Sequence, residues 1–404
     1  MDKKVFENLK VIDFSWVVVG PLIAKCLADF GATVLHIESI TRPDTLRTSL
    51  PYKDGIQDLD FNGYFPLYNS NKYGMALNLQ HPKGLEVARR LVAWSDIVIE
   101  SFRPGVMKRL GLGYEDLKSI KPDLIMLSTT MQGQTGPHAL QPGFGNQLVG
   151  LAGFPCVTGW PDRDAIQPYG AYTDCIAPYF GIATLVGALL YRDRTGRGQH
   201  LDLSQYEAGV QFMSSALLDW VVNDRNAVRE GNSSLCAAPH GAYRCLGEDR
   251  WCAIAVFNDA EWQGLCRAIG KEELIHDRRF ATLSDRKQNE VELNRLVEEW
   301  TLNFDAYEVM AKLQAVGVPA GVVTNNSDLF EDPELKEREC FWMIDHPVLG
   351  PFPHPSPSFM LSETPANPRL PAPCLGQHTE FICKEFLKMS DEEFAQLLNE
   401  GVFK

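Results

Sequence analysis

Short, continuously apolar runs alternate with amphipathic stretches through the first third of the chain. Strands that are buried on both faces give such continuous runs, and parallel strands need helical connections between them. The predicted strands are Leu9–Val19, Thr33–Ile37, Asp96–Ile99 and Leu124–Ser128, and the predicted helices are Leu22–Phe30, His81–Trp94 and Tyr114–Ile120. We therefore expect an α/β fold with an open, parallel, doubly wound sheet, whose ligands bind at the carboxyl ends of the strands.

Composition and charge narrow the classes of partner. The net charge of -14 argues against nucleic acid or an anionic membrane as a partner, although a local group of arginines can still bind a small anion. The ten cysteines form no C-x-x-C pair and show no zinc-site spacing, so we expect free thiols in the cytoplasm and no metal. The start, MDKKVFENLK, lacks the apolar core of a signal peptide. The run Ile176–Leu190 is interrupted by Pro178 and is too short to span a bilayer, so we expect a buried helix.

Common cofactor and nucleophile motifs are missing from the sequence. The first strand-to-helix turn reads VVVGPL, with one glycine followed by proline, whereas a pyrophosphate loop needs G-x-G-x-x-G. There is no G-x-x-x-x-G-K-[ST] phosphate loop and no G-x-S-x-G nucleophile turn. The sequence therefore argues against a dinucleotide-dependent enzyme and against a serine hydrolase of the elbow type.

One carboxylate, Asp174, lies at the start of a long apolar stretch of helical length, Tyr169–Tyr191. An Asp at this position can cap the helix, because free backbone N–H groups and the helix dipole stabilise negative charge. The same position can also hold an ionised carboxylate that faces a pocket. The residues alone leave both roles open, a structural cap and a catalytic carboxylate.

Several segments, in their order and spacing, resemble the class III CoA-transferases, a family that also contains the acyl-CoA racemases. These segments are KVIDFSWVVVGPLIAKCLADFGATVLHIES, YNSNKYGMALNLQ, ESFRPGVMKRLGLGYEDL, GQTGP, PGFGNQLVGLAG, AYTDCIAP, RTGRGQHLDLSQYEA and GVPAGVV. The resemblance implies a large Rossmann-like α/β domain made from both chain ends, here residues 1–222 and a return segment 330–404. It implies a smaller α+β domain at 223–329, and two subunits intertwined like linked rings. The proline-rich stretch Pro347–Pro373, which has little periodicity, fits such a return.

The resemblance makes Asp174, in the AYTDCIAP segment, the nucleophile. Its carboxylate would attack an acyl-CoA thioester to give an aspartyl anhydride and then an aspartyl–CoA thioester, from which CoA passes to a carboxylic acid. An ordinary carboxyl pKa of about 4 would keep such a residue ionised at neutral pH without special tuning. Coenzyme A, as acyl-CoA, is therefore the expected substrate, and no metal is needed.

The resemblance also places residues around CoA. They are Val18 and Val19 through their backbone, Leu77, Phe102 and Arg109 around the adenine and diphosphate, and more loosely Arg42, Arg103, Phe144 and Gly145. One departure concerns the 3′-phosphate, because Ser39 stands where many members carry an arginine. Arg42 and Arg47 are both close enough in sequence to replace it, since a guanidinium donates paired hydrogen bonds to phosphate.

Two other functions compete with CoA transfer. Racemases carry His-Asp where this chain has Phe144-Gly145, and phenylalanine cannot exchange a proton, so a two-base racemase would lack one partner. A pseudo-subunit that only completes a paralogous catalytic chain is the non-enzymatic alternative, and the retained Asp174 argues against it.

Within the family, DFSWVVVGPL, RPDTLRTS, YNSNKYG and TTMQGQTGPHA are similar to the branch that uses succinyl-CoA and (R)-2-benzylsuccinate. The aromatic side chains Phe144, Phe154 and Trp160 could favour an aromatic acyl group of this kind. The expected partners are thus succinyl-CoA, an aryl- or alkyl-succinate, and a second subunit. That subunit is another copy or a paralogue, giving a homodimer, a heterodimer or a heterotetramer.

Overall fold

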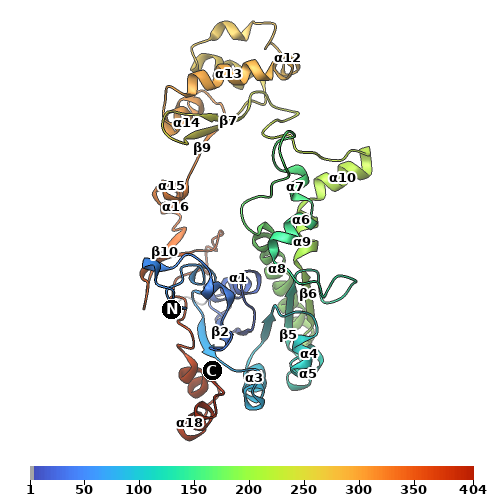
Figure 1. The fold of residues 1–404 in the computed structure, drawn as a ribbon, viewed down its shortest axis with the longest axis vertical. Coiled ribbons are helices and arrows are strands. Elements are labelled where there is room, and N and C mark those ends of the chain that lie inside the picture. The colour runs from blue at the N-terminus through green and yellow to red at the C-terminus, as the bar shows by residue number, and fades with distance from the viewer. Residues whose placement is uncertain (1–3) are drawn as a thin grey trace. The chain divides into compact units, whose positions relative to one another are not determined.

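The computed structural model describes residues 4–404. Their contacts divide the chain into two compact units, each described here by itself (Figure 1). Unit 1 contains the residues up to 155 together with 167–226 and 337–404, and unit 2 contains 156–166 and 227–336. The contacts group residues 156–166 with unit 2, whereas the sequence analysis placed them in the large domain. The domain boundaries drawn from the sequence stay a prediction.

Unit 1 is built on a six-stranded sheet whose neighbouring strands are all parallel, in the order β3-β2-β1-β4-β5-β6. The strands are β1 (Lys10–Asp13), β2 (Thr33–Glu38), β3 (Tyr73–Ala76), β4 (Ile97–Glu100), β5 (Ile125–Thr130) and β6 (His200–Ser204). This sheet confirms the parallel α/β fold expected from the apolar runs. The sequence analysis did not predict β3, which is four residues long and contains a glycine that weakens the strand pattern.

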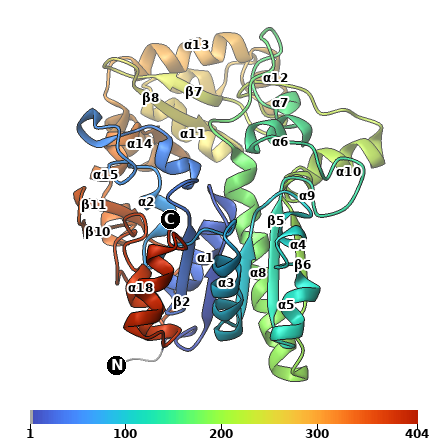
Figure 2. The ribbon, with the colours of Figure 1, turned by 60° about the horizontal axis from the view of Figure 1, so that its bottom comes forward.

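Alternation along the strands sends apolar side chains to two layers. On one face, Val11, Ile97 and Leu127 pack with α1 (Val19–Asp29) and α8 (Tyr172–Thr195). On the other face, Ile12 and Met126 pack with α3 (Pro82–Trp94) and α5 (Tyr114–Ile120). The C-terminal helix α18 (Asp391–Asn399) lies beside α3 (Figure 2), and an ion pair links their residues Arg90 and Glu393. The sheet is therefore covered on both faces, and its strand ends are left for ligands.

The first strand is much shorter than the sequence indicated. β1 ends at Asp13, and α1 already begins at Val19, so the prediction of a strand through Val19 was wrong. Asp13 is fully buried and accepts hydrogen bonds from Lys72 Nζ at 2.9 Å and Ser15 N at 3.0 Å. Burial opposes the charge of Asp13, yet Lys72 and His36 hold its pKa well below the usual range. Lys72 is thus a structural residue, and the buried cluster turns the chain out of the sheet.

Helix α8 is longer and less buried than expected. It runs for 24 residues without a break at Pro178, and by length and composition it could cross a membrane, although helices in the cores of soluble proteins pass the same test. Gly181 lets α8 approach α1 closely, because a Cβ there would lie 3.2 Å from Ile23 Cγ1 and 3.1 Å from Leu203 Cδ2. The expectation that this run is too short to span a bilayer was therefore wrong, and the expected buried helix is buried only in part.

The C-terminal segment of the chain returns to unit 1. It begins with the hairpin β10 (Phe341–His346) and β11 (Gly350–Pro355), so part of the proline-rich stretch is paired backbone. Beyond the hairpin, Leu370 O accepts a hydrogen bond from Asn71 N at 2.9 Å, and Val402 O accepts one from Asn78 N at 2.8 Å. These bonds fasten the return segment along the β3 edge of the sheet.

Unit 2 has a three-stranded antiparallel sheet in the order β7-β8-β9, with its own apolar core. The strands are β7 (His240–Arg244), β8 (Trp251–Ala255) and β9 (Ala320–Val323), and its main helices are α11 (Asp259–Ala268), α12 (Leu283–Gln288), α13 (Glu290–Thr301) and α14 (Ala306–Gln314). β7 and β8 form an antiparallel hairpin.

Shorter helices connect these elements. They are α2 (Pro66–Asn69), α4 (Val106–Arg109), α6 (Gly145–Leu151), α7 (Phe154–Val157), α9 (Gln205–Phe212), α10 (Ser214–Asn223), α15 (Asn326–Glu331), α16 (Pro333–Glu337) and α17 (Thr379–Phe381). The helices α9 and α10 follow one another and are separated at Met213.

Candidate active site

Asp174 lies in the first turn of α8. The cap position is Ala171, whose carbonyl accepts a hydrogen bond from Asp174 N at 2.8 Å, so the interpretation of Asp174 as the N-cap was wrong. Its half-buried carboxylate is not paired with any cation among residues 4–404, and burial raises its pKa to about 6. The expectation of an unperturbed pKa near 4 was therefore wrong as well.

Gly145 makes room for this carboxylate. A Cβ built at Gly145 would lie 2.6 Å from Ala171 Cβ and 2.7 Å from Asp174 Cγ, and closer still to Asp174 Oδ1. The Thr173 hydroxyl also donates to the Gly145 carbonyl at 3.3 Å, which ties α6 to the start of α8. Any larger residue at position 145 would push the carboxylate aside.

A cavity of about 340 Å³, which we call the Asp174 cavity, contains this carboxylate. It is lined by residues 16–20, 101–104, 129–131, 139, 141–145, 174 and 205, and these come largely from the carboxyl ends of the strands β1, β4 and β5. Among the described residues that line it, Asp174 and Arg103 are the only charged ones, and none is a histidine. The Arg103 guanidinium donates to the Leu140 carbonyl at 2.7 Å and so holds the 139–145 loop at the cavity.

The loop between β1 and α1 forms one wall of this cavity and is fixed at three points. Trp16 N donates to Ser101 Oγ at 3.0 Å, and the Trp16 indole N–H donates to the Ile37 carbonyl at 3.3 Å. Val17 N donates to both carboxylate oxygens of Asp44, at 3.0 and 3.2 Å. Val17 has a φ of 71°, a left-handed conformation that is costly for a β-branched residue. The loop is therefore held in a strained shape directly before Val18 and Val19.

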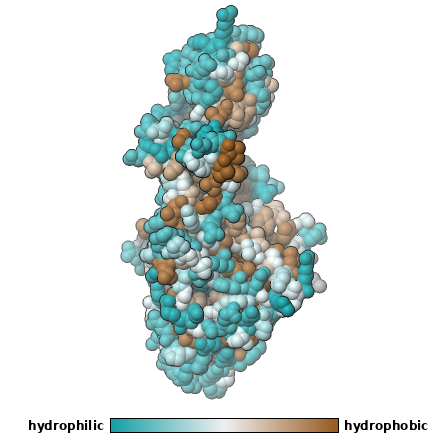
Figure 3. Space-filling model, turned by 90° about the vertical axis from the view of Figure 1, so that its right-hand side faces the viewer, coloured by the Kyte–Doolittle hydropathy of each residue, from teal (hydrophilic) through white to brown (hydrophobic). Residues whose placement is uncertain are grey.

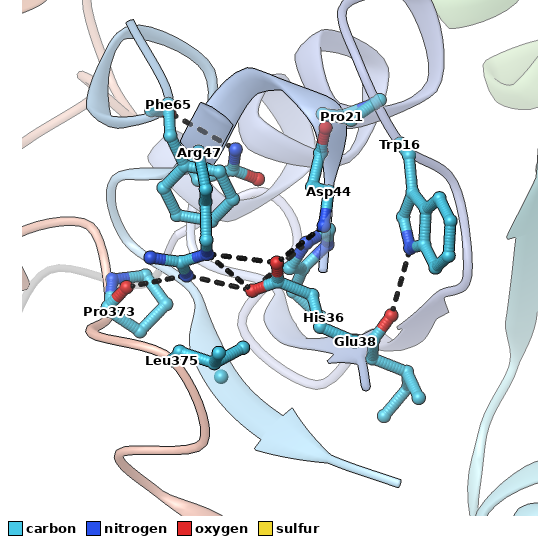
Figure 4. A network of polar contacts seen from close by, with 12 residues as sticks. Trp16, Pro21, His36, Glu38, Asp44, Arg47, Phe65, Pro373 and Leu375 are labelled. Atoms are coloured by element: carbon cyan, nitrogen blue, oxygen red, sulfur yellow. Dashed lines mark hydrogen bonds and ion pairs between the residues drawn. The ribbon is translucent and has the colours of Figure 1, made fainter. Parts of the chain in front are cut away.

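A buried network anchors Asp44 (Figure 4). Asp44 N donates to Glu38 Oε1 at 3.1 Å, and Glu38 pairs with Arg47 at 2.7 Å. Arg47 is fully buried, stacks on Phe65 with its guanidinium 3.6 Å from the ring centre, and donates to the Pro373 carbonyl. The Arg47 guanidinium is thus fully engaged within the protein, which removes it as a candidate for the CoA 3′-phosphate.

A second cavity of about 330 Å³, which we call the Arg42 cavity, shares Trp16, Phe102 and Arg103 with the first. The rings of Trp16 and Phe102 meet edge to face, with their centroids 5.7 Å apart. Arg42 is exposed and lies over the Trp16 ring, 5.9 Å from its centre, and Leu77 forms a buried part of the wall. This cavity therefore combines an exposed cation, an aromatic surface and an apolar wall.

The structure gathers most of the predicted site residues around these two cavities. Val18, Val19, Phe102, Arg103, Phe144, Gly145 and Asp174 line the Asp174 cavity, and Arg42 and Leu77 line the Arg42 cavity. Arg109 lines neither cavity and is exposed on α4. Phe154 is a buried core residue, and Trp160 belongs to unit 2, so neither lines the Asp174 cavity.

Sequence reasoning missed several residues of the site. Trp16 stood within a predicted strand, Thr129 came directly after the predicted strand Leu124–Ser128, and Asp44 was not considered. The position of Thr129 at the carboxyl end of a parallel strand was the one available signal. Within residues 4–404, no three His, Cys, Asp or Glu side chains are placed to hold a metal ion, and the expected absence of metal stays a prediction.

The comparisons with known proteins agree over nearly the whole chain. The model of CoA-transferase family III matches residues 6–379. A succinyl-CoA–D-citramalate CoA-transferase from Chloroflexus aurantiacus is 31% identical over 391 residues, which cover 97% of this chain and 96% of that protein. The beta subunit of a succinyl-CoA–L-malate CoA-transferase from the same organism is 33% identical over 406 residues, covering 98% and 97%. A solved CAIB/BAIF family protein from Brucella suis matches with a TM-score of 0.88 and 30% identity, covering 96% of this chain and 100% of that one. The chain therefore belongs to CoA-transferase family III and is a CoA-transferase.

Proposed function

We propose that this enzyme transfers CoA from succinyl-CoA to a dicarboxylic acid, with Asp174 as the covalent nucleophile. The observation that carries the proposal is the position of Asp174, the only carboxylate among the described residues lining its cavity, at the end of a helix. The relatives named for succinyl-CoA, D-citramalate and L-malate support the choice of donor and of acceptor class.

The proposed reaction proceeds in four covalent steps that balance. The Asp174 carboxylate attacks the thioester carbonyl, CoA leaves as a thiolate, and a succinyl–aspartyl anhydride remains. The thiolate attacks the aspartyl carbonyl, which releases succinate and leaves an aspartyl–CoA thioester. The acceptor carboxylate then attacks that carbonyl and displaces the thiolate again. The thiolate finally attacks the acceptor carbonyl of the new anhydride, which gives acceptor-CoA and free Asp174.

We place the CoA nucleotide in the Arg42 cavity and the thioester in the Asp174 cavity. Arg42 supplies a cation for a phosphate, and Leu77 supplies an apolar wall for adenine. Phe102 and Arg103 lie on the shared wall between the two, and Val18 and Val19 offer backbone groups beside Asp174. Arg109, exposed on α4, is kept as a contact to the diphosphate outside both cavities.

For the acceptor we propose (R)-2-benzylsuccinate or a similar aryl- or alkyl-succinate. Phe144 is 65% exposed and, like Phe102, lines the Asp174 cavity, so that an apolar substituent on the acid would cover it. The smaller hydroxy acids named for the relatives, malate and citramalate, are the competing acceptors.

The test is a CoA-exchange assay followed by mass spectrometry. Purified protein, with and without a paralogous partner, is incubated with succinyl-CoA and a panel of acids: benzylsuccinate, methylsuccinate, malate, citramalate and glutarate. We expect transfer to at least one of them, fastest to benzylsuccinate, and hydroxylamine added during turnover should label Asp174 alone. Asp174→Asn should lower the rate by about 10³-fold or more, the scale for losing a covalent nucleophile. An Asp174→Asn variant with more than a few per cent of wild-type activity would contradict the proposal.

Racemase activity is the second candidate, and the cavity argues against it. Moving an α-proton from one face to the other needs a base on each side, and the described lining residues offer only Asp174. We expect no deuterium uptake at the α-carbon of a 2-methylacyl-CoA in heavy water without an acceptor acid. Rapid uptake would favour the racemase instead.

We also propose that the catalytic unit contains a second chain, a copy or a paralogue, intertwined with this one. The relative named as a beta subunit supports the paralogue, and the citramalate CoA-transferase, whose name carries no subunit, supports a copy. The free thiols of the described cysteines are consistent with the cytoplasmic location, which stays a prediction.

A further inference from the structure

The hydroxyl of Thr129 has no structural role that its contacts with the described residues explain. The residue is fully buried at the carboxyl end of β5, and its Oγ1 has no hydrogen-bond partner among the described residues. Thr129 lines the Asp174 cavity. It stands two and four residues after Leu127 and Ile125, which pack with α1 and α8, so the same alternation turns the Thr129 side chain toward those helices.

The N-terminus of α1 meets the same cavity. The first N–H groups of a helix have no partner inside it, and Val18 provides no side-chain cap. Pro21 has no N–H, so Val19 and Gly20 supply the first-turn donors, and both line the Asp174 cavity. Helix α1 has 11 residues, so its dipole adds positive potential at this end.

We propose that the Thr129 hydroxyl and the α1 N-terminus form a subsite for an anionic acyl oxygen. Two sources have this chemistry: the oxyanion that forms when Asp174 attacks the thioester, and the carboxylate of the acceptor acid. The subsite rests on the proposed function, since it serves the acyl group that reacts at Asp174. Hydroxyl and backbone N–H donors stabilise such an oxygen most strongly in a cavity with little water.

The proposal predicts that removing the Thr129 hydroxyl lowers activity but leaves the stability of the fold unchanged or raises it. A buried hydroxyl without a partner costs folding free energy, because its hydrogen bonds to water are lost and not replaced. Valine has the shape of threonine without the hydroxyl. Thr129→Val should therefore leave the melting temperature unchanged or raise it, while the subsite loses its side-chain donor. A structural threonine would give the reverse, a lower melting temperature.

The experiment compares Thr129→Val and Thr129→Ser with wild type in steady-state kinetics. We expect kcat/KM to fall on the order of 10²- to 10³-fold for valine and to recover largely for serine, which keeps the hydroxyl. A fall in kcat with all acids, already present in the donor half-reaction, assigns the thioester oxyanion. A rise in KM for the acid alone assigns the acceptor carboxylate.

Ser70→Ala is the matched control, because Ser70 is also buried with an unpartnered hydroxyl but lines neither cavity. It should keep wild-type kinetics. Binding of succinate, followed as a rise in melting temperature, tests the subsite even if no acid in the panel accepts CoA, so that failure of the two proposals can be told apart. Unchanged kinetics and unchanged succinate binding in Thr129→Val, or a clear loss of thermal stability, would overturn the subsite.

Discussion

Asp174 is a carboxylate whose surroundings oppose its own charge. Burial raises its pKa to about 6, and no cation in the described cavity wall is bonded to it. A carboxylate that is poorly solvated is a better nucleophile than one held in a salt bridge, because less stabilisation is lost when it attacks. The same feature that costs stability therefore serves the proposed chemistry.

The pKa of Asp174 predicts an acid limit to activity. The rate of the donor half-reaction should be constant above pH 6 to 7 and fall about tenfold per pH unit below a pKa of about 6, because only the ionised carboxylate attacks. Asp44 also has a pKa of about 6, so the profile is repeated with Asp44→Asn, in which the limit should persist. Activity that stays constant down to pH 4.5 in single-turnover measurements would contradict the assignment.

The raised pKa of Asp174 affects activity and stability in opposite directions: activity should rise with pH, whereas the stability of the fold should fall. Because the pKa of Asp174 is higher in the folded state than its ordinary value of 3.8, the folded protein binds this proton more tightly, and stability is lost as pH rises from about 4 to 6. At pH 7.5, Asp174→Asn should thus raise the melting temperature while it removes activity, and the difference should shrink near pH 4. A lower melting temperature at pH 7.5 would argue that the charge is stabilised in the fold.

Gly145 offers a steric test of the same carboxylate. In Gly145→Ala the new methyl group would overlap Asp174 Oδ1 and Ala171 Cβ, so the carboxylate must move. A misplaced reacting group costs on the order of 10²-fold in rate, and we expect a loss of that size in kcat with an intact fold. Gly150→Ala is the control in the same helix, because its Cβ would meet nothing within 4 Å. Equal activities of the two variants would show that the contact is unimportant.

At the scale of elements, the strained loop between β1 and α1 is the feature that most clearly positions the candidate site. Val17 is held in its left-handed conformation by the two hydrogen bonds to Asp44. In Asp44→Ala, the loop should relax and kcat/KM for succinyl-CoA should fall about tenfold, since a left-handed β-branched residue costs on the order of 1–3 kcal/mol. Adding Val17→Gly should restore most of the activity, because glycine adopts this conformation without strain. A general loss of stability would not be rescued in this way, so a double variant as poor as Asp44→Ala would refute the positioning role.

The helices and strands with a regular apolar pattern could be predicted from the sequence, but the residues at which the chain leaves those elements could not. The parallel sheet and helices such as α3 and α5 followed from the apolar patterns of their sequences. The end of β1 did not, because it depends on the buried pairing of Asp13 with Lys72, which is 59 residues away. Burial of that kind is set by tertiary contacts and leaves no local pattern.

The candidate site also contains features that the local sequence predicts and features that depend on tertiary contacts. Asp174 stood out because a carboxylate at the start of an apolar helix is a local feature. The sequence did not distinguish Arg42 from Arg47, because both are arginines near the end of β2. Only the pairing of Arg47 with Glu38 separates them. The raised pKa of Asp174 was equally hidden, because it follows from residues that the fold brings together.

At the scale of the whole molecule, the helices α8 and α10 leave large apolar side chains uncovered. In α10, Leu218, Val221 and Val222 are 61%, 76% and 74% exposed, and in α8, Tyr179 and Leu190 are 55% and 53% exposed. Figure 3 shows several groups of hydrophobic side chains among hydrophilic ones on the face that it draws. Large apolar side chains exposed on neighbouring helices are typical of protein–protein interfaces. We therefore assign this surface to the second chain of the proposed assembly.

Two experiments address this assembly. Intertwined subunits cannot separate without unfolding, so tagged and untagged protein mixed under native conditions should give no mixed dimers by native mass spectrometry. The second uses the double variant Val221→Glu/Val222→Glu. On a free surface such changes alter stability by roughly 0.5 kcal/mol or less, whereas two carboxylates in a dry interface are strongly unfavourable. We expect the double variant to lose the assembly, while the control Val291→Glu, at a site on α13 that is 89% exposed, should keep it. A double variant that assembles like wild type would show that α10 faces solvent in the working enzyme.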